Sequence, residues 1–147
     1  MIFSVFGRIL HIFVTYLNSY HQTIKFELTY SYYNINFLDT TVYRKKETNT
    51  LHTKLYIKPT HKNQYLHFSS EYPFHVKKAI PYAQALRFRR IVDEDNVLQT
   101  ELHNLKLKFK NRGYTDSLSD KEISRVRDVN REDTLRYKNS ENIQVQD

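Results

Sequence analysis

The sequence predicts an α+β fold, in which an N-terminal helix lies on a three-stranded antiparallel meander and a basic loop leads into a three-helix bundle. Three observations predict it. Apolar residues recur at helical spacing near the N-terminus, alternate with polar residues over 24–57, and return to helical spacing after Pro81. With 147 residues, of which 39% are hydrophobic, the chain is long enough to bury a core.

The same patterns divide the chain into four parts. Residues 1–58 are expected to hold the helix and the meander, which ends before Pro59. Residues 59–80 form a basic, histidine-rich connector, 81–130 the three-helix unit, and 131–147 a polar tail.

The first helix is expected over about 8–19, because Leu10, Phe13, Val14 and Leu17 recur at helical spacing and form one apolar stripe. An apolar start is also typical of a signal peptide, but charged and polar residues interrupt it and no small-residue cleavage site follows. The uncharged stretch is far shorter than the ~18–20 residues of a membrane span. We therefore expect a core helix and no membrane partner.

Three strands are expected between residues 24 and 57. Residues 24–30 alternate apolar and polar side chains, which is typical of a half-buried strand. Residues 35–43 are rich in β-branched and aromatic side chains, and 51–57 carry apolar residues on one face. The polar residues 45–49 are typical of a hairpin loop between the second and third strands.

The bundle is expected to begin at a proline. A short helix is predicted over 73–79, and Pro81 suits the first turn of a longer helix over 81–92, because its missing N–H costs nothing there. The polar residues at 93–96 are expected to cap the helix that follows.

Two further helices are expected over 96–112 and 119–130. The first has apolar residues in a 4-3-4 spacing from Leu98 to Phe109, a seam that faces a partner helix. Ser119 is expected to open the second in a capping box. Three helices with a short break before the last resemble a helix-turn-helix arrangement, although the periodicity alone supports only a small helical bundle.

The composition excludes several kinds of site. The chain has no cysteine, which excludes disulfides, a thiol nucleophile and cysteine-based zinc sites. Its two glycines lie far apart, which argues against a glycine-rich phosphate loop. The seven histidines show no zinc-helix spacing, no carboxylates are paired for acid–base work, and no nucleophile elbow is present. We expect no catalytic residue, no metal site and no cofactor.

The positive charge is concentrated in one block. The net charge is +7, and Arg44–Arg90 alone holds eleven basic and two acidic residues. Aromatic residues are interleaved with these cations, a combination typical of nucleic-acid grooves, where cations contact phosphates and aromatic faces contact bases or sugars. The alternative is a solvated surface with a lopsided charge. We expect Tyr56 and Phe88 to be core residues, and Tyr65 and Tyr82 to be exposed.

Five blocks of sequence occur in an order that matches a known family. They are FVTYLNSYHQTIKFELTY (13–30), INFLDTTVYR (35–44), LYIKPTHKNQYLHFSS (55–70), HVKKAIPYAQALRFRRI (75–91) and NRGYTDSLSDKEISRVRDV (111–129). Over about residues 12–138 the chain resembles the C-terminal part of reverse transcriptases from Penelope-like retroelements. The resemblance implies that 1–58 is the end of the polymerase palm and that the helices form a thumb-like unit. A similar three-helix segment also occurs in animal sequences as a helix-turn-helix domain.

The chain departs from that family where catalysis would occur. The family holds its catalytic metal, a divalent ion such as Mg²⁺, with an aromatic-x-Asp-Asp motif, and this sequence has no adjacent Asp-Asp pair. The family's Cys-His-Pro is replaced here by Glu71-Tyr72-Pro73. The resemblance therefore implies a non-catalytic fragment that binds a template–primer duplex through its basic connector and helix, with no enzymatic activity and no cofactor of its own.

Ten residues are predicted to contact RNA or DNA. Eight cations are expected at phosphates, and a tyrosine and a histidine at sugars or bases: Lys54, Lys58, Lys62, Lys77, Lys78, Arg87, Arg89 and Arg90, with Tyr65 and His67. The missing upstream palm and fingers portion of the polymerase is a second expected partner. The expected location is intracellular, either nuclear or cytoplasmic.

Two alternatives stay open. One is a helix-turn-helix DNA-binding protein, in which 119–130 reads base edges with Arg125 and Arg127. The other is an inert, pseudogene-derived remnant, whose aromatic meander exposes apolar surface when the rest of the palm is missing.

Overall fold

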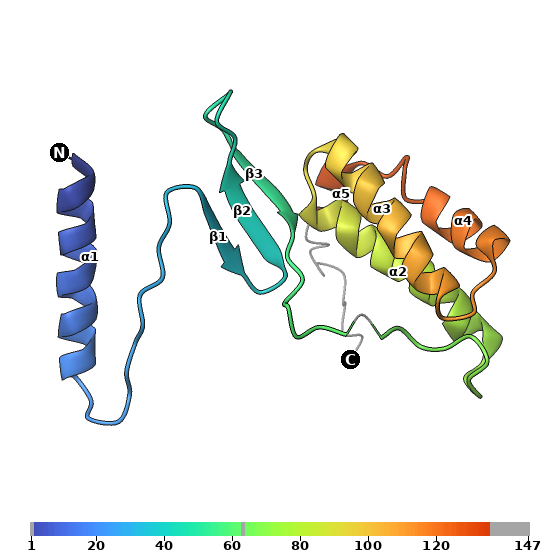
Figure 1. Cartoon of the computed structure of the whole chain (residues 1–147), viewed down its shortest axis with the longest axis horizontal. Helices are drawn as coiled ribbons and strands as arrows, with labels where there is room; N and C mark the ends of the chain where they lie inside the picture. The colour runs from blue at the N-terminus through green and yellow to red at the C-terminus, as the bar shows by residue number, and fades with distance from the viewer. Residues whose placement is uncertain (1, 63, 136–147) are drawn as a thin grey trace, which may run out of the picture. The chain divides into compact units, whose positions relative to one another are not determined.

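The computed structural model describes residues 2–62 and 64–135, with side chains from Ile9 onward (Figure 1). It falls into two compact units, Met1–Tyr33 and Asn34–Asp147. The described residues form a helix, a three-stranded antiparallel sheet and four further helices, in that order, which confirms the α+β prediction. No helix among them is long and apolar enough to cross a membrane.

The first unit contains one helix, α1 (Ile2–Ser19), followed by a segment without regular structure. The strand predicted over 24–30 is therefore wrong. A strand needs a neighbouring backbone, and the described part of this unit offers 24–30 only a helix end. There the side-chain amide of Asn18 donates to the Phe26 carbonyl (3.0 Å) and accepts from the Phe26 N–H (2.6 Å). Asn18 thus satisfies both backbone groups of one residue in place of a strand.

The sheet begins the second unit and is a simple meander. Its strands are β1 (Asn34–Phe37), β2 (Thr40–Arg44) and β3 (Leu51–Leu55), paired antiparallel in the order β1-β2-β3. The loop predicted over 45–49 does join β2 to β3, and the Lys45 N–H donates to the Thr50 carbonyl at its base (2.9 Å).

The strand predicted over 35–43 is in fact a hairpin. Phe37 pairs directly with Thr40, so Leu38 and Asp39 form a two-residue turn. Leu38 takes a left-handed backbone conformation (φ 55°), which is uncommon for a residue with a large side chain. Contacts far along the chain hold the turn in place, because Arg87 donates to the Asp39 carboxylate from Nε (2.9 Å) and Nη2 (2.6 Å). Sequence alone could not signal a turn that depends on such a partner.

The acidic stretch after residue 92 joins the sheet to the bundle. It was predicted to cap the next helix, but Glu94 at the N-cap makes no side-chain capping hydrogen bond. Glu94 instead bonds Tyr43 and Lys45, while Asp93 accepts from the Thr53 N–H (3.1 Å). Burial, followed by the Glu94 contact, raises the pKa of Tyr43 to about 12. These acids therefore act as anchors for the strands.

The helices are α2 (Phe74–Ile91), α3 (Asp95–Lys110), α4 (Asp116–Ser124) and α5 (Arg131–Leu135). The predicted break before Pro81 is wrong, since α2 runs through this residue. A proline inside a helix removes one backbone hydrogen bond and costs roughly 3 kcal/mol. The Pro81 ring is fully buried in the bundle, and this burial offsets part of the cost.

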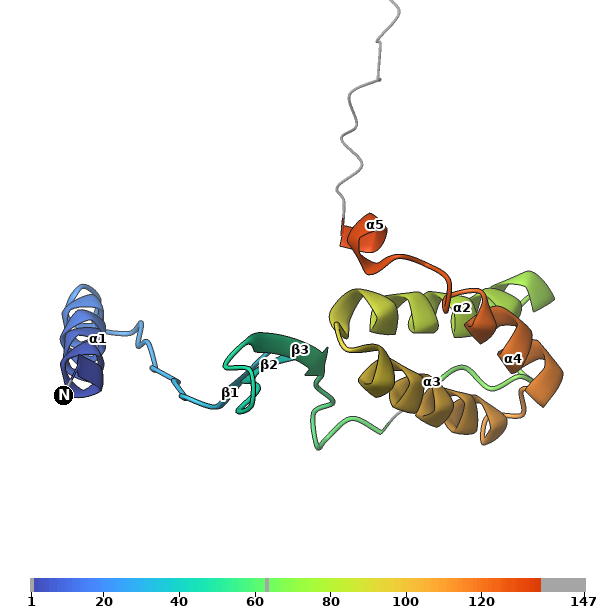
Figure 2. The same ribbon diagram turned by 90° about the horizontal axis from the view of Figure 1, so that it is seen from above.

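The core lies between α2, α3 and α4, and the three helices pack against one another in pairs (Figure 2). The predicted seam of α3 is confirmed, because all four of its residues are buried. The buried apolar residues are Ala85, Phe88, Val92, Leu98, Leu102, Leu105, Phe109, Tyr114, Ile123 and Val126.

The last helix of the bundle begins earlier and ends earlier than predicted. Thr115 is its N-cap and accepts a hydrogen bond from the Leu118 N–H (3.3 Å). Ser119, the predicted cap, lies inside α4 and is buried. The expected helix over 119–130 therefore stops at Ser124, and turns lead from there to α5. The predicted polar tail thus begins as a short helix, and its residues 136–147 lie outside the described residues.

Candidate nucleic-acid interface

Half of the predicted contact residues are engaged inside the protein. Lys77 donates from Nζ to the carbonyls of Phe68 (2.8 Å) and Ser70 (3.0 Å) and so fixes the connector on α2. Lys78 lies 3.8 Å from the carboxylate of the buried Glu122. Arg87 pairs with Asp39, and Arg89 pairs with Asp95 and donates to the Val129 carbonyl. The Tyr65 ring stacks on Phe109, with the centroids 4.7 Å apart.

The other half is displayed outward. Lys54, Lys58, Lys62 and Arg90 are exposed, and they form no ion pair within the part of the chain that the structure describes. Lys54 also lies over the Tyr43 ring, with Nζ 5.2 Å from the centroid. His67 is also exposed, with its Nδ1 2.8 Å from the Ser69 hydroxyl. Of the aromatic predictions, Phe88 is a core residue as expected, whereas Tyr56, Tyr65 and Tyr82 are each half-buried.

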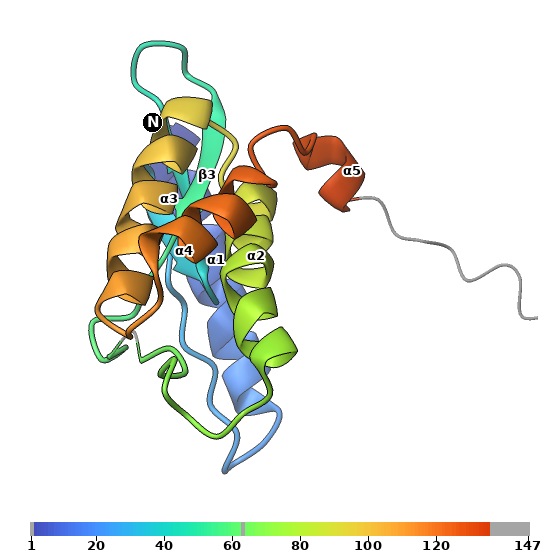
Figure 3. The same ribbon diagram turned by 90° about the vertical axis from the view of Figure 1, so that its right-hand side faces the viewer.

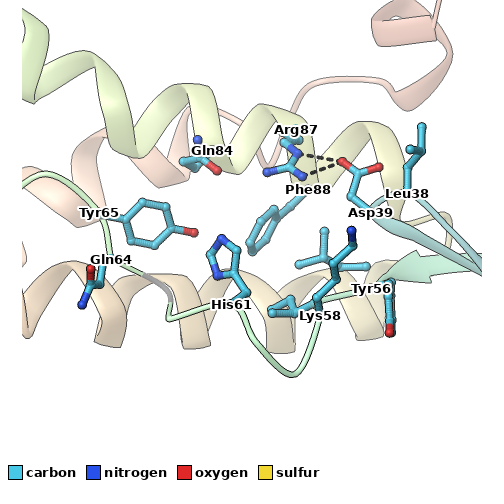
Figure 4. A pocket seen from close by; sticks show the side chains of 12 residues that line it. Leu38, Asp39, Tyr56, Lys58, His61, Gln64, Tyr65, Gln84, Arg87 and Phe88 are labelled. Carbon is cyan, nitrogen blue, oxygen red and sulfur yellow. Dashed lines mark hydrogen bonds and ion pairs between the residues drawn. The ribbon is translucent and has the colours of Figure 1, made fainter.

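One cavity brings Lys58, Tyr65 and Arg87 together. It has a volume of about 320 Å³ and lies where the β1–β2 turn, the connector and α2 meet. The His61 ring, the Tyr65 hydroxyl and the Arg87–Asp39 pair surround this space (Figure 4). The hydrogen bond from Arg87 lowers the pKa of the Asp39 carboxyl, and burial raises that of Tyr65. Because Asp39 neutralises Arg87, the cavity is mixed in charge.

A second, more open cleft is purely basic and polar. It has a volume of about 360 Å³ and is lined by Lys62, Gln64, Lys108, Asn111 and Arg112. It lies where the connector runs beside the C-terminal end of α3 (Figure 3). Among the described residues, the lining contains three cations, two amides and no carboxylate.

The outer surface of α4 has the opposite charge character. Asp116 and Asp120 are exposed there, and they pair with Lys110 (3.1 Å) and Lys106 (2.8 Å) of α3. Within α4 itself, Lys121 is the exposed cation. A helix with this composition offers little attraction to phosphates.

Of the two arginines proposed as base readers, Arg127 is exposed and Arg125 is held against the protein. Its Nη1 lies 2.7 Å from the carboxylate of Glu122, which is only 2% exposed. Its guanidinium also stacks over the Tyr82 ring, 4.4 Å from the centroid. Arg125 therefore neutralises a buried charge, and it lies beyond the end of α4.

Residues 64–124 match the animal helix-turn-helix domain family. The match begins in the connector and ends at the last residue of α4, so it contains α2, α3 and α4 but neither the sheet nor α1. No curated protein and no solved structure gave a significant match to the chain. The match covers less than half of the chain, and it identifies the three-helix region as helix-turn-helix-like.

The turn between α3 and α4 explains why residue 113 is a glycine. Gly113 has a φ of +79°, and a Cβ there would lie 3.4 Å from the His67 ring. The neighbouring Arg112 carbonyl accepts from the Phe68 N–H (2.9 Å). The turn and the connector are thus packed together, which fixes the wall of the basic cleft.

Sequence analysis missed two cations of this cleft, Lys108 and Arg112, because they lie beyond the basic block that ends at Arg90. For Lys108 the signal that could have found it is the helical period, which turns it away from Lys106 and Lys110, its neighbours two residues to either side. Arg112 lies in the turn after α3, where the helical period gives no such signal.

Proposed function

We propose that the chain binds nucleic acid through phosphate contacts, as a non-catalytic piece of a Penelope-like reverse transcriptase. The observation that carries the proposal is the outward display of four cations without ion pairs in the described part of the chain, Lys54, Lys58, Lys62 and Arg90. They belong to a strongly basic block, Arg44–Arg90, that extends into the helix-turn-helix-like region. The five family blocks support the retroelement origin.

The proposal has consequences for partners and chemistry. The partner is a template–primer duplex of RNA or DNA, held by its backbone with little sequence preference. The chain itself performs no catalysis and needs no cofactor, because it lacks the Asp-Asp pair that would hold a divalent metal. It works inside the cell, in the nucleus or cytoplasm, together with the palm and fingers portion of the polymerase.

The test is fluorescence anisotropy with a labelled 20-base-pair duplex DNA, the matching RNA–DNA hybrid and a single strand, over a series of salt concentrations. About four neutralised phosphates predict a slope of about −3 to −4 for log affinity against log salt on the duplexes. A flat salt response would overturn the proposal.

A matched pair of variants separates displayed cations from paired ones. Lys54→Gln with Arg90→Gln should reduce the slope by about 2, because two phosphate contacts are lost. Lys106→Gln with Lys110→Gln removes the same charge but from cations already paired with Asp120 and Asp116, so the slope should change little. Equal effects of the two variants would count against specific contacts from the basic block.

The family match also favours a second candidate function, a sequence-specific helix-turn-helix DNA-binding protein. In that case α4 would enter the major groove, and selection from random duplex DNA would enrich a motif. Enrichment of no motif, together with salt-dependent binding to all duplexes, would support the reverse-transcriptase proposal.

A further inference from the structure

The lysines of α3 are divided into two rows. Lys106 and Lys110 face α4, where Asp120 and Asp116 neutralise them. Lys108 is two residues from each and so points about 200° away around the helix, because successive residues are turned by about 100°. Arg112 lies in the turn after α3 and lines the basic cleft together with Lys108. Lys106 and Lys110 therefore serve the protein's own acids, whereas Lys108 faces the cleft.

The cations of the cleft are available to a ligand. Lys62, Lys108 and Arg112 take part in no ion pair among the described residues, and no carboxylate lines the cleft. Lys108 and Arg112 are half-buried, so part of their hydration is already lost. Packing of the connector on α3, through Tyr65 on Phe109, holds the walls in place before any ligand arrives.

The chemistry of the lining identifies the ligand class. A guanidinium and two ammonium groups bind phosphate oxygens, and the amides of Gln64 and Asn111 can donate further hydrogen bonds. Within the part of the chain that the structure describes, no aromatic side chain lines this cleft to stack on a base. A chain of phosphodiesters matches this lining, and such contacts position a protein without reading sequence.

We infer that nucleic acid docks with its sugar–phosphate backbone in the cleft of Lys62, Lys108 and Arg112, and that α4 does not enter a groove. The inference rests on the proposed function and adds Lys108 and Arg112, beside Lys62, to the cations that it assigns to phosphates. The composition of α4 disfavours the alternative, because its exposed acids are already paired with lysines of α3 and Lys121 is the exposed cation that this helix could offer to phosphates.

The experiment compares two double variants of the full chain that change the net charge equally. Lys108→Gln with Arg112→Gln alters the cleft, and Lys121→Gln with Arg127→Gln alters the α4 side, where both cations are exposed. Binding to duplex DNA and to the RNA–DNA hybrid is measured by anisotropy over a salt series. The cleft variant should lose at least about tenfold in affinity at low salt and about 2 in salt slope, and the α4 variant should change little.

Each outcome decides between the faces. A loss confined to the α4 variant, or an equal loss in both, would overturn the inference while leaving nucleic-acid binding intact. Absence of binding by the wild-type chain would overturn the proposed function itself. The single variant Lys62→Gln is the control for a folding defect in the double variant, because Lys62 is exposed on the connector. It should reduce the slope by about 1 with an unchanged thermal melt, and an unchanged slope would contradict the inference.

Discussion

Helix α1 and helix α3 both carry apolar stripes at helical spacing but bury them differently. In the α1 stripe Phe13 is 55% exposed and the other three residues are only half-buried, whereas in α3 Leu105 and Phe109 are both completely buried. The segment that follows α1 resembles α1 in this respect, since its aromatic and aliphatic residues are exposed. Periodicity therefore determines which face of an element is apolar, and the rest of the chain must supply the surface that covers it.

The contrast leaves the first unit with uncovered apolar surface. Between Ile9 and Tyr33, most large apolar side chains are exposed, and the described residues do not cover them. The second unit differs, because its helices share one continuous buried core, and this core is expected to unfold cooperatively.

The largest expected difference in unfolding free energy is between two alanine variants, one at a phenylalanine of each helix. Phe109→Ala should cost about 3–5 kcal/mol of unfolding free energy, because a completely buried ring that stacks on Tyr65 and Tyr114 is removed. Phe13→Ala should cost less than about 0.5 kcal/mol, because its ring is largely exposed. Urea unfolding followed by circular dichroism measures both. Similar losses would mean that α1 is packed as firmly as α3.

A smaller effect distinguishes the true N-cap of α4 from the one that the sequence suggested. Thr115→Ala should cost about 1 kcal/mol, because it removes the oxygen that accepts from the Leu118 N–H. Ser119→Ala should be neutral or slightly stabilising, because the buried Ser119 hydroxyl has no hydrogen-bond partner among the described residues. Thermal melts of the two variants provide the measurement. A larger loss of stability at Ser119 than at Thr115 would show that Ser119 is the N-cap, as the sequence suggested.

Local pattern predicted what depends on local pattern. The α3 seam from Leu98 to Phe109 was predicted because every fourth or third residue is apolar, and the third strand because its residues are strand formers with a clear loop before them. The turn at Leu38 and Asp39 was missed, since it lacks glycine and asparagine and is held by Arg87, 48 positions away. The helix across Pro81 was missed for a similar reason, because tertiary burial outweighs a local penalty.

The candidate site was likewise predicted only where it depends on local sequence. Charge density along the chain identified Lys58 and Lys62, which do line cavities on the surface. It also selected Arg87 and Arg89, whose partners Asp39 and Asp95 a linear charge count cannot reveal. Lys108 was missed because the count along the chain ignores how a helix separates neighbouring cations into rows. Placement by the fold decides which cations remain available for phosphates.

The smallest effect concerns the pair that ties the sheet to α2. The hydrogen bond from Arg87 holds the pKa of Asp39 below its ordinary value, so the folded state favours the ionised carboxylate. The resulting stabilisation is complete above the ordinary pKa of about 4 and is lost as the pH falls through the lowered folded-state pKa. It should amount to less than about 1 kcal/mol, because both side chains are more than a third exposed to solvent.

Asp39→Asn makes this pair measurable. The wild type should exceed the variant in unfolding free energy by a constant amount from about pH 5 to pH 7, and the difference should shrink below about pH 4. Other acid-sensitive groups, including Glu94, whose pKa the contacts with Lys45 and Tyr43 lower, act equally in both proteins and cancel in the difference. Urea unfolding at a series of pH values provides the data. A difference that grows on acidification would show that Arg87 does not hold the turn, and the sheet would then depend on the Asp93–Glu94 anchors alone.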